Sequence, residues 1–180
     1  MRFKINWIGW CMQQKKLIIF SLHYAKRLAK LVSRHLPDQG TVGVLGLSYK
    51  PDTPVSEKSQ GLLLAQHLVE QEVPVVVYDP EALPGATKVL GDRVIYAGSA
   101  EECARQADVL VLTTPWDEFK RLTPEHLNRG KGTPTVVDCW RILPRAQFEA
   151  VANYIVLGAG GRAEAGSLLV GAAASALAEG

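Results

Sequence analysis

The chain has 180 residues, enough for one domain with a hydrophobic core but too few for two complete α/β domains. Hydrophobic residues make up 47%, charged residues 21%, and the formal net charge is +2, so the composition lacks the concentrated positive charge of a nucleic-acid-binding protein. No apolar run approaches the ~20 residues that cross a bilayer, so we expect no membrane partner. Cys11, Cys103 and Cys139 are widely spaced and odd in number, which predicts a cytoplasmic protein without a disulfide scaffold.

The first 38 residues divide into two segments. Residues 1–16 mix charged, polar and aromatic side chains and support no structural interpretation; they lack the clean apolar core of a secretory signal. From residue 17 onward, apolar side chains recur at helical spacing with Lys and Arg between them, which predicts an amphipathic helix over residues 17–36. Pro37 and Gly40 are expected to end this helix.

Residues 41–60 combine a strand, a polar loop and the start of a helix. A short apolar run over 42–47 predicts a strand that is buried on both faces. Pro51 and Pro54 then prevent continuation as strand or helix, which predicts a rigid loop. Capping residue types follow, and then an apolar helix over 62–69. In an open α/β sheet, anionic ligands bind at such a junction.

Further strands and helices alternate along the rest of the chain. We predict strands at 73–79, 93–96 (an edge strand), 108–114, 134–140 and 154–157, and helices that begin at Ser99, at Thr123-Pro124 and at Pro144. This alternation predicts an α/β fold with a Rossmann-like, doubly wound, mostly parallel sheet, preceded by the N-terminal helix. Residues 161–180 are an Ala/Gly-rich tail, and the sequence does not decide between a helix and a frayed end there.

Several motifs resemble a known family in the same order along the chain. Gly-Leu-Ser-Tyr-Lys-Pro-Asp-Thr at 46–53 is similar to the loop that opens the C-terminal, UDP-binding domain of the UDP-glucose/GDP-mannose dehydrogenase family. Tyr-Asp-Pro at 78–80, the segment 107–119 with its tryptophan and phenylalanine, and Val-Val-Asp-Cys-Trp-Arg at 136–141 fit the same pattern. The resemblance implies a UDP-sugar-binding domain over 39–160, with 17–38 as the end of a central dimerisation helix.

The resemblance also implies a function. Complete members oxidise the C6 hydroxyl of a nucleotide sugar in two NAD-dependent steps, using a catalytic cysteine that lies in a different, upstream domain. This chain is therefore expected to be the UDP-sugar-binding domain of an NAD-dependent nucleotide-sugar 6-dehydrogenase of the UDP-glucose or UDP-mannosaminuronate type, within polysaccharide biosynthesis. Because neither the NAD domain nor the cysteine segment is matched, we expect a truncated chain that binds no NAD and does not catalyse the oxidation alone.

Two other functions stay open at this point. The chain can be a non-catalytic nucleotide-binding or dimerisation module, which would form a homodimer through its N-terminal helix as the complete enzyme is expected to do. It can also be a free-standing oxidoreductase.

The predicted substrate-binding residues are Tyr49, Lys50, Thr53 and Arg141. Lys50 would place an ammonium near the diphosphate or sugar, and the Thr53 hydroxyl would either contact the ligand or cap a turn. Arg141 follows a core strand, and a guanidinium suits bidentate contact with phosphate. In the family, the matching arginine reaches the ligand from a neighbouring subunit. The alignment leaves two residues open for this position, Arg141 and Trp140.

The chain also departs from patterns that would assign a cofactor or a nucleophile. Pro54-Val55-Ser56 stands where the family has acidic residues and an NAD-associated arginine, and no Gly-x-Gly-x-x-Gly follows the first strand, so we assign no cofactor-binding residue. Cys139 is interpreted as a buried strand residue rather than a nucleophile. Asp79 is interpreted as a strand-end turn residue rather than a ribose ligand.

Aromatic residues and histidines add no further site. Trp116 and Phe119 are expected to pack a loop over the sheet rather than stack on a base. His23, His35, His67 and His126 are scattered without metal-ligand spacing, so no metal site and no catalytic residue is predicted.

Overall fold

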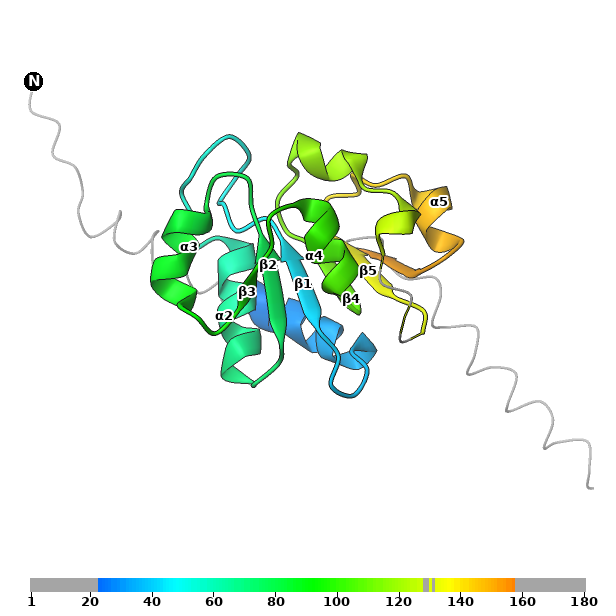
Figure 1. The fold of residues 1–180 in the computed structure, drawn as a ribbon, viewed down its shortest axis with the longest axis horizontal. Helices are drawn as coiled ribbons and strands as arrows, with labels where there is room; N and C mark the ends of the chain where they lie inside the picture. Colours follow the sequence, from blue (N-terminus) through cyan, green and yellow to red (C-terminus); the bar gives the residue numbers. More distant parts are fainter. Residues whose placement is uncertain (1–22, 128–129, 131, 158–180) are drawn as a thin grey trace, which may run out of the picture.

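The computed structural model describes residues 23–127, 130 and 132–157. Within this part of the chain, six strands form one parallel sheet in the order β3-β2-β1-β4-β5-β6 (Figure 1). The strands are β1 (Val42–Leu45), β2 (Val75–Tyr78), β3 (Ile95–Tyr96), β4 (Val109–Leu112), β5 (Thr135–Asp138) and β6 (Asn153–Val156). The predicted doubly wound α/β class is confirmed. The predictions for residues 1–16, for the first turns of the N-terminal helix and for the tail at 161–180 lie outside the described residues.

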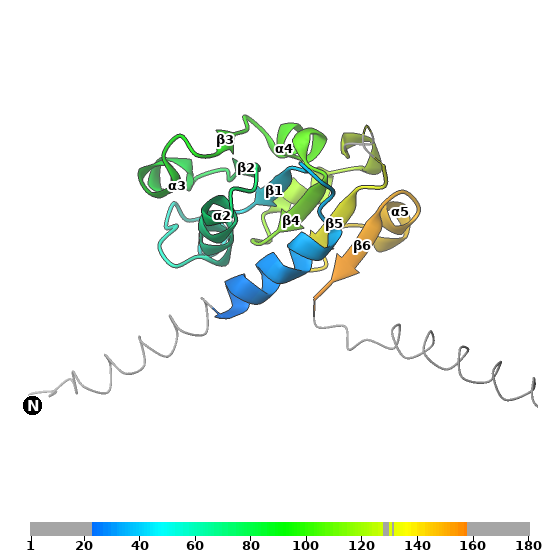
Figure 2. The ribbon, with the colours of Figure 1, turned by 90° about the horizontal axis from the view of Figure 1, so that it is seen from below.

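Helices cover both faces of the sheet (Figure 2). They are the N-terminal helix, described over 23–35, α2 (Gln60–Glu70), α3 (Leu83–Leu90), α4 (Ala100–Gln106) and α5 (Arg145–Glu149), with 3₁₀ turns η1 (Asp117–Arg121) and η2 (Pro124–His126). The N-terminal helix, α2 and α3 share one hydrophobic core, while α4, η1 and α5 share the core on the opposite face. Successive strand residues serve alternate cores, as Val76 and Val77 do, because side chains alternate across a strand.

The order of the strands reverses between β1 and β4. β1 pairs with β2 on one side and with β4 on the other, so Leu45 aligns with Leu112 at the carboxyl end of the pair. In doubly wound sheets, ligands bind in the crevice beyond the carboxyl ends of the strands at such a switch point. In the described residues, no helix is both long and apolar enough to span a membrane.

Local structure differs from the sequence prediction at three helix starts. The predicted helix at Thr123-Pro124 is only the 3₁₀ turn η2. The capping-box pattern at Ser99 is half formed: Ser99 Oγ accepts from the amide of Glu102 at 3.1 Å, but the Glu102 carboxylate accepts from Gly98 instead. Helix α3 was not predicted, because Pro84 and Gly85 in its first turn resemble a loop, although proline is well tolerated there.

Two glycines let α2 approach the end of β1 closely. Gly46 has a φ of +97°, and a Cβ atom there would lie 2.6 Å from the Thr114 side chain. Gly61, in the first turn of α2, faces this turn, and a Cβ atom on it would clash with the carbonyl oxygen of Gly46. The start of α2 is therefore held against the loop that leaves β1.

We predict that Gly61→Ala destabilises the fold by about 1–3 kcal/mol, because the added methyl group overpacks the contact with Gly46. In an ordinary helix interior the same change stabilises by about 0.5–1 kcal/mol, so the sign of the effect is informative. Urea unfolding of both proteins measures it, with the exposed Glu70→Ala on the same helix as the control. A Gly61→Ala protein as stable as its parent would contradict the close approach.

Candidate functional site

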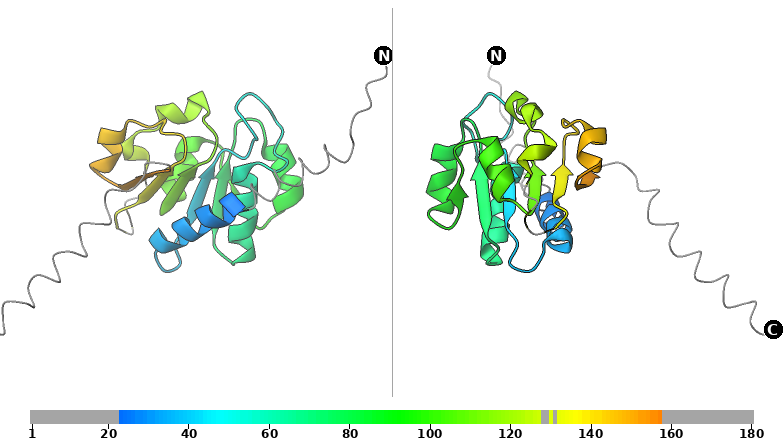
Figure 3. Two further views of the ribbon diagram at one scale, coloured as in Figure 1. Left: turned by 180° about the vertical axis from the view of Figure 1, so that it is seen from behind. Right: turned by 45° about the vertical axis from the view of Figure 1, so that its right-hand side comes forward.

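Loops that follow three neighbouring strands gather at the carboxyl edge of the sheet. The loop after β1 and the 3₁₀ turns after β4 lie at the same end of the sheet (Figure 3), and residues 139–144 follow β5. These loops contain the residues predicted to bind substrate. The order of strands puts the loop after β4 between those after β1 and β5.

A buried carboxylate fixes the base of the loop after β1. Asp79 follows β2 directly and is 1% exposed. Its Oδ2 atom accepts hydrogen bonds from the amide of Leu47 at 2.7 Å and from the amide and hydroxyl of Ser48 at 2.9 and 2.8 Å. The indole of Trp116, from the loop after β4, donates to the same oxygen at 3.2 Å. Asp79 therefore joins the loops that follow β1, β2 and β4.

The other oxygen of Asp79 is also engaged. Oδ1 accepts from the amides of Glu81 and Ala82, at 2.9 and 2.7 Å, and so forms the turn into α3. The interpretation of Asp79 as a strand-end turn residue is confirmed. The ribose of a dinucleotide would have to displace these donors, so this strand end does not fit the acidic ribose ligand of NAD-binding folds.

Residues 46–59 are tied down at their base and exposed at their tip. Ser59 Oγ donates to the Leu47 carbonyl at 2.6 Å, and the amide of Tyr49 donates to the Val55 carbonyl at 2.7 Å. Thr53 Oγ1 accepts from the amide of Val55 at 3.3 Å, which is the turn-capping arrangement that the sequence left open. Tyr49 is 61% exposed. The loop thus presents its tip to solvent from a fixed base.

The two predicted basic residues lie on this edge but differ in their surroundings. Lys50 is exposed, and no acidic side chain of the described residues forms an ion pair with it. Arg141 has a φ of +58°, and its Nη2 donates to the carbonyl of Leu157 at 3.0 Å, just beyond β6. The Arg141 guanidinium is therefore held toward the edge strand, whereas Lys50 is available to a ligand.

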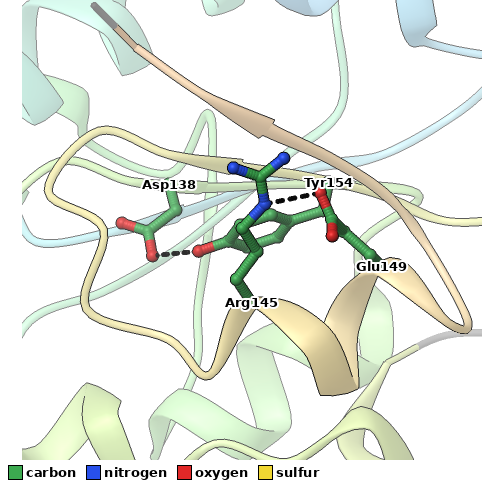
Figure 4. A network of polar contacts seen from close by, with 4 residues as sticks. All are labelled: Asp138, Arg145, Glu149 and Tyr154. Atoms are coloured by element: carbon green, nitrogen blue, oxygen red, sulfur yellow. Dashed lines mark hydrogen bonds and ion pairs between the residues drawn. The ribbon is translucent and has the colours of Figure 1, made fainter. Parts of the chain in front are cut away.

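A second buried carboxylate organises the loop after β5. Asp138, the last residue of β5, accepts from the amides of Trp140 and Leu143 at 3.0 and 2.9 Å, and from the Tyr154 hydroxyl at 2.7 Å (Figure 4). Burial and this hydrogen bond to Asp138 raise the pKa of Tyr154. The exposed ion pair between Arg145 and Glu149 lies beside the tyrosine, as Figure 4 shows. Asp138 therefore fixes the backbone that carries Trp140 and Arg141.

A cavity of about 230 Å³ opens at the carboxyl ends of β4 and β5, next to the start of α2. It is lined by Tyr24, Gln60, Thr113, Cys139 and Trp140. Neither Lys50 nor Arg141 is among these lining residues. Sequence reasoning did not find Tyr24 or Gln60; the position of Gln60 as the first residue of a helix at the switch point was the available signal.

Cys139 is a partly buried thiol in the wall of this cavity. Burial raises its pKa to about 12, although a hydrogen bond with Tyr24 opposes the shift. The pKa of Tyr24 is likewise raised to about 12, mainly by burial and to a smaller extent by the neighbouring Cys139. Both groups are therefore protonated at neutral pH, which agrees with the interpretation of Cys139 as a residue other than a nucleophile.

The remaining candidates behave as structural residues. Trp116 and Phe119 are 7% and 0% exposed and belong to one hydrophobic core, which confirms that they pack the loop onto the sheet. No group of three or more His, Cys, Asp or Glu side chains among the described residues is arranged to hold a metal ion.

A doubly wound parallel sheet with a polar loop at its switch point defines a class of nucleotide-binding α/β domains. The sequence profile described as "UDP-glucose/GDP-mannose dehydrogenase family, UDP binding domain" matches residues 43–145, more than half of the chain. The chain therefore belongs to this family, as the motifs predicted.

Individual relatives agree with the family. The chain is 35% identical over 97 residues to the UDP-glucose 6-dehydrogenase of Rhizobium meliloti, covering 54% of this chain and 22% of that protein. It is 40% identical over 88 residues to UDP-glucose 6-dehydrogenase AglM of Haloferax volcanii, covering 49% and 20%. A UDP-glucose dehydrogenase structure from Pyrobaculum islandicum superposes with a TM-score of 0.58 at 28% identity, covering 76% of this chain and 29% of that one. The chain thus matches about a fifth of the length of these curated relatives.

We predict that Asp79→Asn destabilises the fold by about 2–4 kcal/mol, because the amide would place N–H donors against the donors that now surround the carboxylate. Chemical unfolding measures the loss. Asp117→Asn, at an exposed aspartate that forms a surface ion pair with Lys120, should leave the unfolding midpoint nearly unchanged. Equal midpoints for Asp79→Asn and its parent would show that the carboxylate does not hold these loops.

Alkylation by iodoacetamide should be slow at Cys139 in the folded protein. With a pKa of about 12, the thiolate fraction at pH 8 is small, and the rate should keep rising tenfold per pH unit beyond pH 9. In urea the same cysteine should react at least about 100-fold faster at pH 8, with a rate that levels off above its ordinary pKa of about 8.5. Peptide mapping by mass spectrometry follows Cys139 separately. A folded-state rate that levels off near pH 8.5 would contradict its protonated state.

Proposed function

We propose that this chain is the UDP-sugar-binding domain of an NAD-dependent nucleotide-sugar 6-dehydrogenase. The observation that carries the proposal is the loop at 46–53, which matches the family motif, follows β1 at the switch point and presents the exposed Lys50 from a fixed base. A UDP-sugar carries a diphosphate, and an ammonium without an acidic partner is a suitable contact for it.

The other three predicted residues differ in how directly they would contact the ligand. Tyr49 is exposed beside Lys50 and is available to the sugar or the nucleotide. Thr53 holds the turn of the loop, so its contribution to the ligand acts through the position of Lys50. Arg141 would contact a phosphate only after its hydrogen bond to the Leu157 carbonyl breaks. A phosphate already bound by Lys50 would favour this change, because a guanidinium binds phosphate through two hydrogen bonds.

Oxidation of the sugar belongs, in this proposal, to the complete enzyme. The matched relatives are much longer than this chain, and Asp79 does not fit a dinucleotide ribose, so NAD is assigned to another part of that enzyme. Cys103 and Cys139 are free thiols, which supports a reducing, cytoplasmic location.

A dimerisation or assembly module is the second candidate function. A groove of about 430 Å³ lies between the N-terminal helix and Leu157, where the apolar Leu28 and Leu31 adjoin the basic Arg27 and Arg34. Such a surface would suit a partner helix, and it supports homodimerisation through the N-terminal helix as the alternative proposal. Sedimentation with and without UDP separates the two functions: a dimer whose mass and stability ignore UDP favours the assembly module.

Titration calorimetry with UDP and UDP-glucose tests the proposed function. We expect binding by the parent and a loss of about tenfold or more in Lys50→Ala, because a charge-assisted hydrogen bond to phosphate contributes about 1.5–3 kcal/mol. Lys88→Ala, which removes an exposed lysine from the last turn of α3, is the matched control and should bind like the parent. Equal affinities of the parent and Lys50→Ala would remove Lys50 from the site.

A further inference from the structure

Charge is unevenly distributed along this chain. The formal net charge is only +2, from 20 Lys and Arg and 18 Asp and Glu. The first acidic residue is nevertheless Asp38, and residues 1–37 contain eight of the Lys and Arg side chains. The remaining 143 residues therefore carry 12 basic and 18 acidic residues, a net charge of −6. Such asymmetry indicates a charged partner for the basic segment.

The described part of the N-terminal helix presents its cations in a row. Arg27, Lys30 and Arg34 are exposed and follow the helical spacing i, i+3, i+7, so they lie along one side of the helix. None of these three residues, which we call the cationic row, forms an ion pair with an acidic side chain of the described residues. Like charges three and four positions apart destabilise a helix, so an acidic partner along the row would relieve their repulsion.

An apolar groove lies beside the cationic row. Tyr24, Leu28 and Leu31 follow the spacing i, i+4, i+7 on the neighbouring side of the helix, and Leu157, just after β6, lines the same groove (Figure 2). With the cationic row, they border about 430 Å³. Tyr24, Leu31 and Leu157 are only partly buried against the core, so each leaves some of its surface uncovered. Apolar walls with a charged rim suit one face of an amphipathic helix.

Three other occupants match this groove less well. A second copy of the chain that docked through the same helix would add its own cations, because residues 1–37 contain no acidic side chain. An anionic bilayer surface is too flat to fill a groove of this size. The phosphate backbone of a nucleic acid supplies negative charge but no apolar side chain to cover Leu31 and Leu157. An acidic amphipathic helix supplies both charge and apolar contact.

We propose that the groove binds an acidic amphipathic helix of another protein, whose apolar face covers the leucines and whose carboxylates pair with the cationic row. This proposal is independent of the UDP-sugar site, because Lys50, Tyr49, Thr53 and Arg141 do not line the groove. It also differs from homodimerisation in its salt dependence: low salt favours the pairing of opposite charges and opposes the approach of two basic helices.

The first test changes the charge of a probe peptide. A labelled synthetic helix of about 20 residues carries Leu at i, i+3, i+4 and i+7 and Glu at the flanking positions; a second peptide has Gln in place of every Glu. Fluorescence anisotropy should show the full chain binding the Glu peptide about tenfold more tightly than the Gln peptide at ~50 mM NaCl. This preference should shrink at ~500 mM, because salt screens the ion pairs. Equal affinities at low salt would overturn the proposal.

The second test changes the cationic row. A protein with Arg27→Gln, Lys30→Gln and Arg34→Gln should bind the two peptides alike, because the three ion pairs that favour Glu are lost. A control protein loses the same charge at exposed cations elsewhere, through Lys88→Gln, Arg105→Gln and Arg121→Gln. The control should keep the tenfold preference. An equal loss in both proteins would show that the peptide responds to net charge and not to the groove.

The last test separates the groove from the charge alone. Leu31→Ser should weaken the binding of both peptides about fivefold or more, because it removes apolar contact and leaves the cationic row intact. Thermal unfolding checks that the variant is folded, and the comparison of the two peptides on the parent needs no variant. Unchanged binding by Leu31→Ser would overturn the docking in the groove. So would tighter binding of the parent to phosphatidylserine vesicles or duplex DNA than to the Glu peptide, or a dimer that excludes the peptide.

Discussion

The carboxylate of Asp79 is the interaction on which the carboxyl edge of this domain depends. This buried group accepts hydrogen bonds from the amides of Leu47 and Ser48, from the Trp116 indole and from the turn into α3. Hydrogen bonds to a buried carboxylate are stronger than those between neutral groups, and leaving any of these donors unpaired would be costly. The loop after β1 therefore has a fixed base, although its tip at Lys50 is exposed.

Asp138 repeats this arrangement on the other side of the switch point. It holds the backbone that leads to Trp140 and is itself bound by the Tyr154 hydroxyl. Between the two carboxylates, Gly46 and Gly61 allow α2 to meet the end of β1 without intervening side chains. These fixed loops and the close start of α2 border a cavity at the ends of β4 and β5. In doubly wound sheets, ligands bind in the crevice beyond the carboxyl ends of the strands.

Much of the fold could be predicted from the sequence, because buried parallel strands are short apolar runs and the loops between them contain proline and glycine. Helix α3 could not, since Pro84 and Gly85 obscure its first turn. The interpretation of Asp79 as a turn residue was correct, but its bonds to the loop after β1 join residues more than 30 positions apart, which no local pattern reveals. Gln60 was missed for the same reason: its unpaired oxygen matters only once the fold places it beside Trp140.

The most direct measurement of the central claim is a ¹H–¹⁵N NMR titration of the chain with UDP. If the fixed carboxyl edge is the nucleotide site, the shifts should cluster in the amides of 46–53 and in the indole of Trp140. Residues at the amino ends of the strands, such as Thr41 and Thr135, should not move. Shifts centred on those amino ends, or no shifts at saturating UDP, would contradict the account.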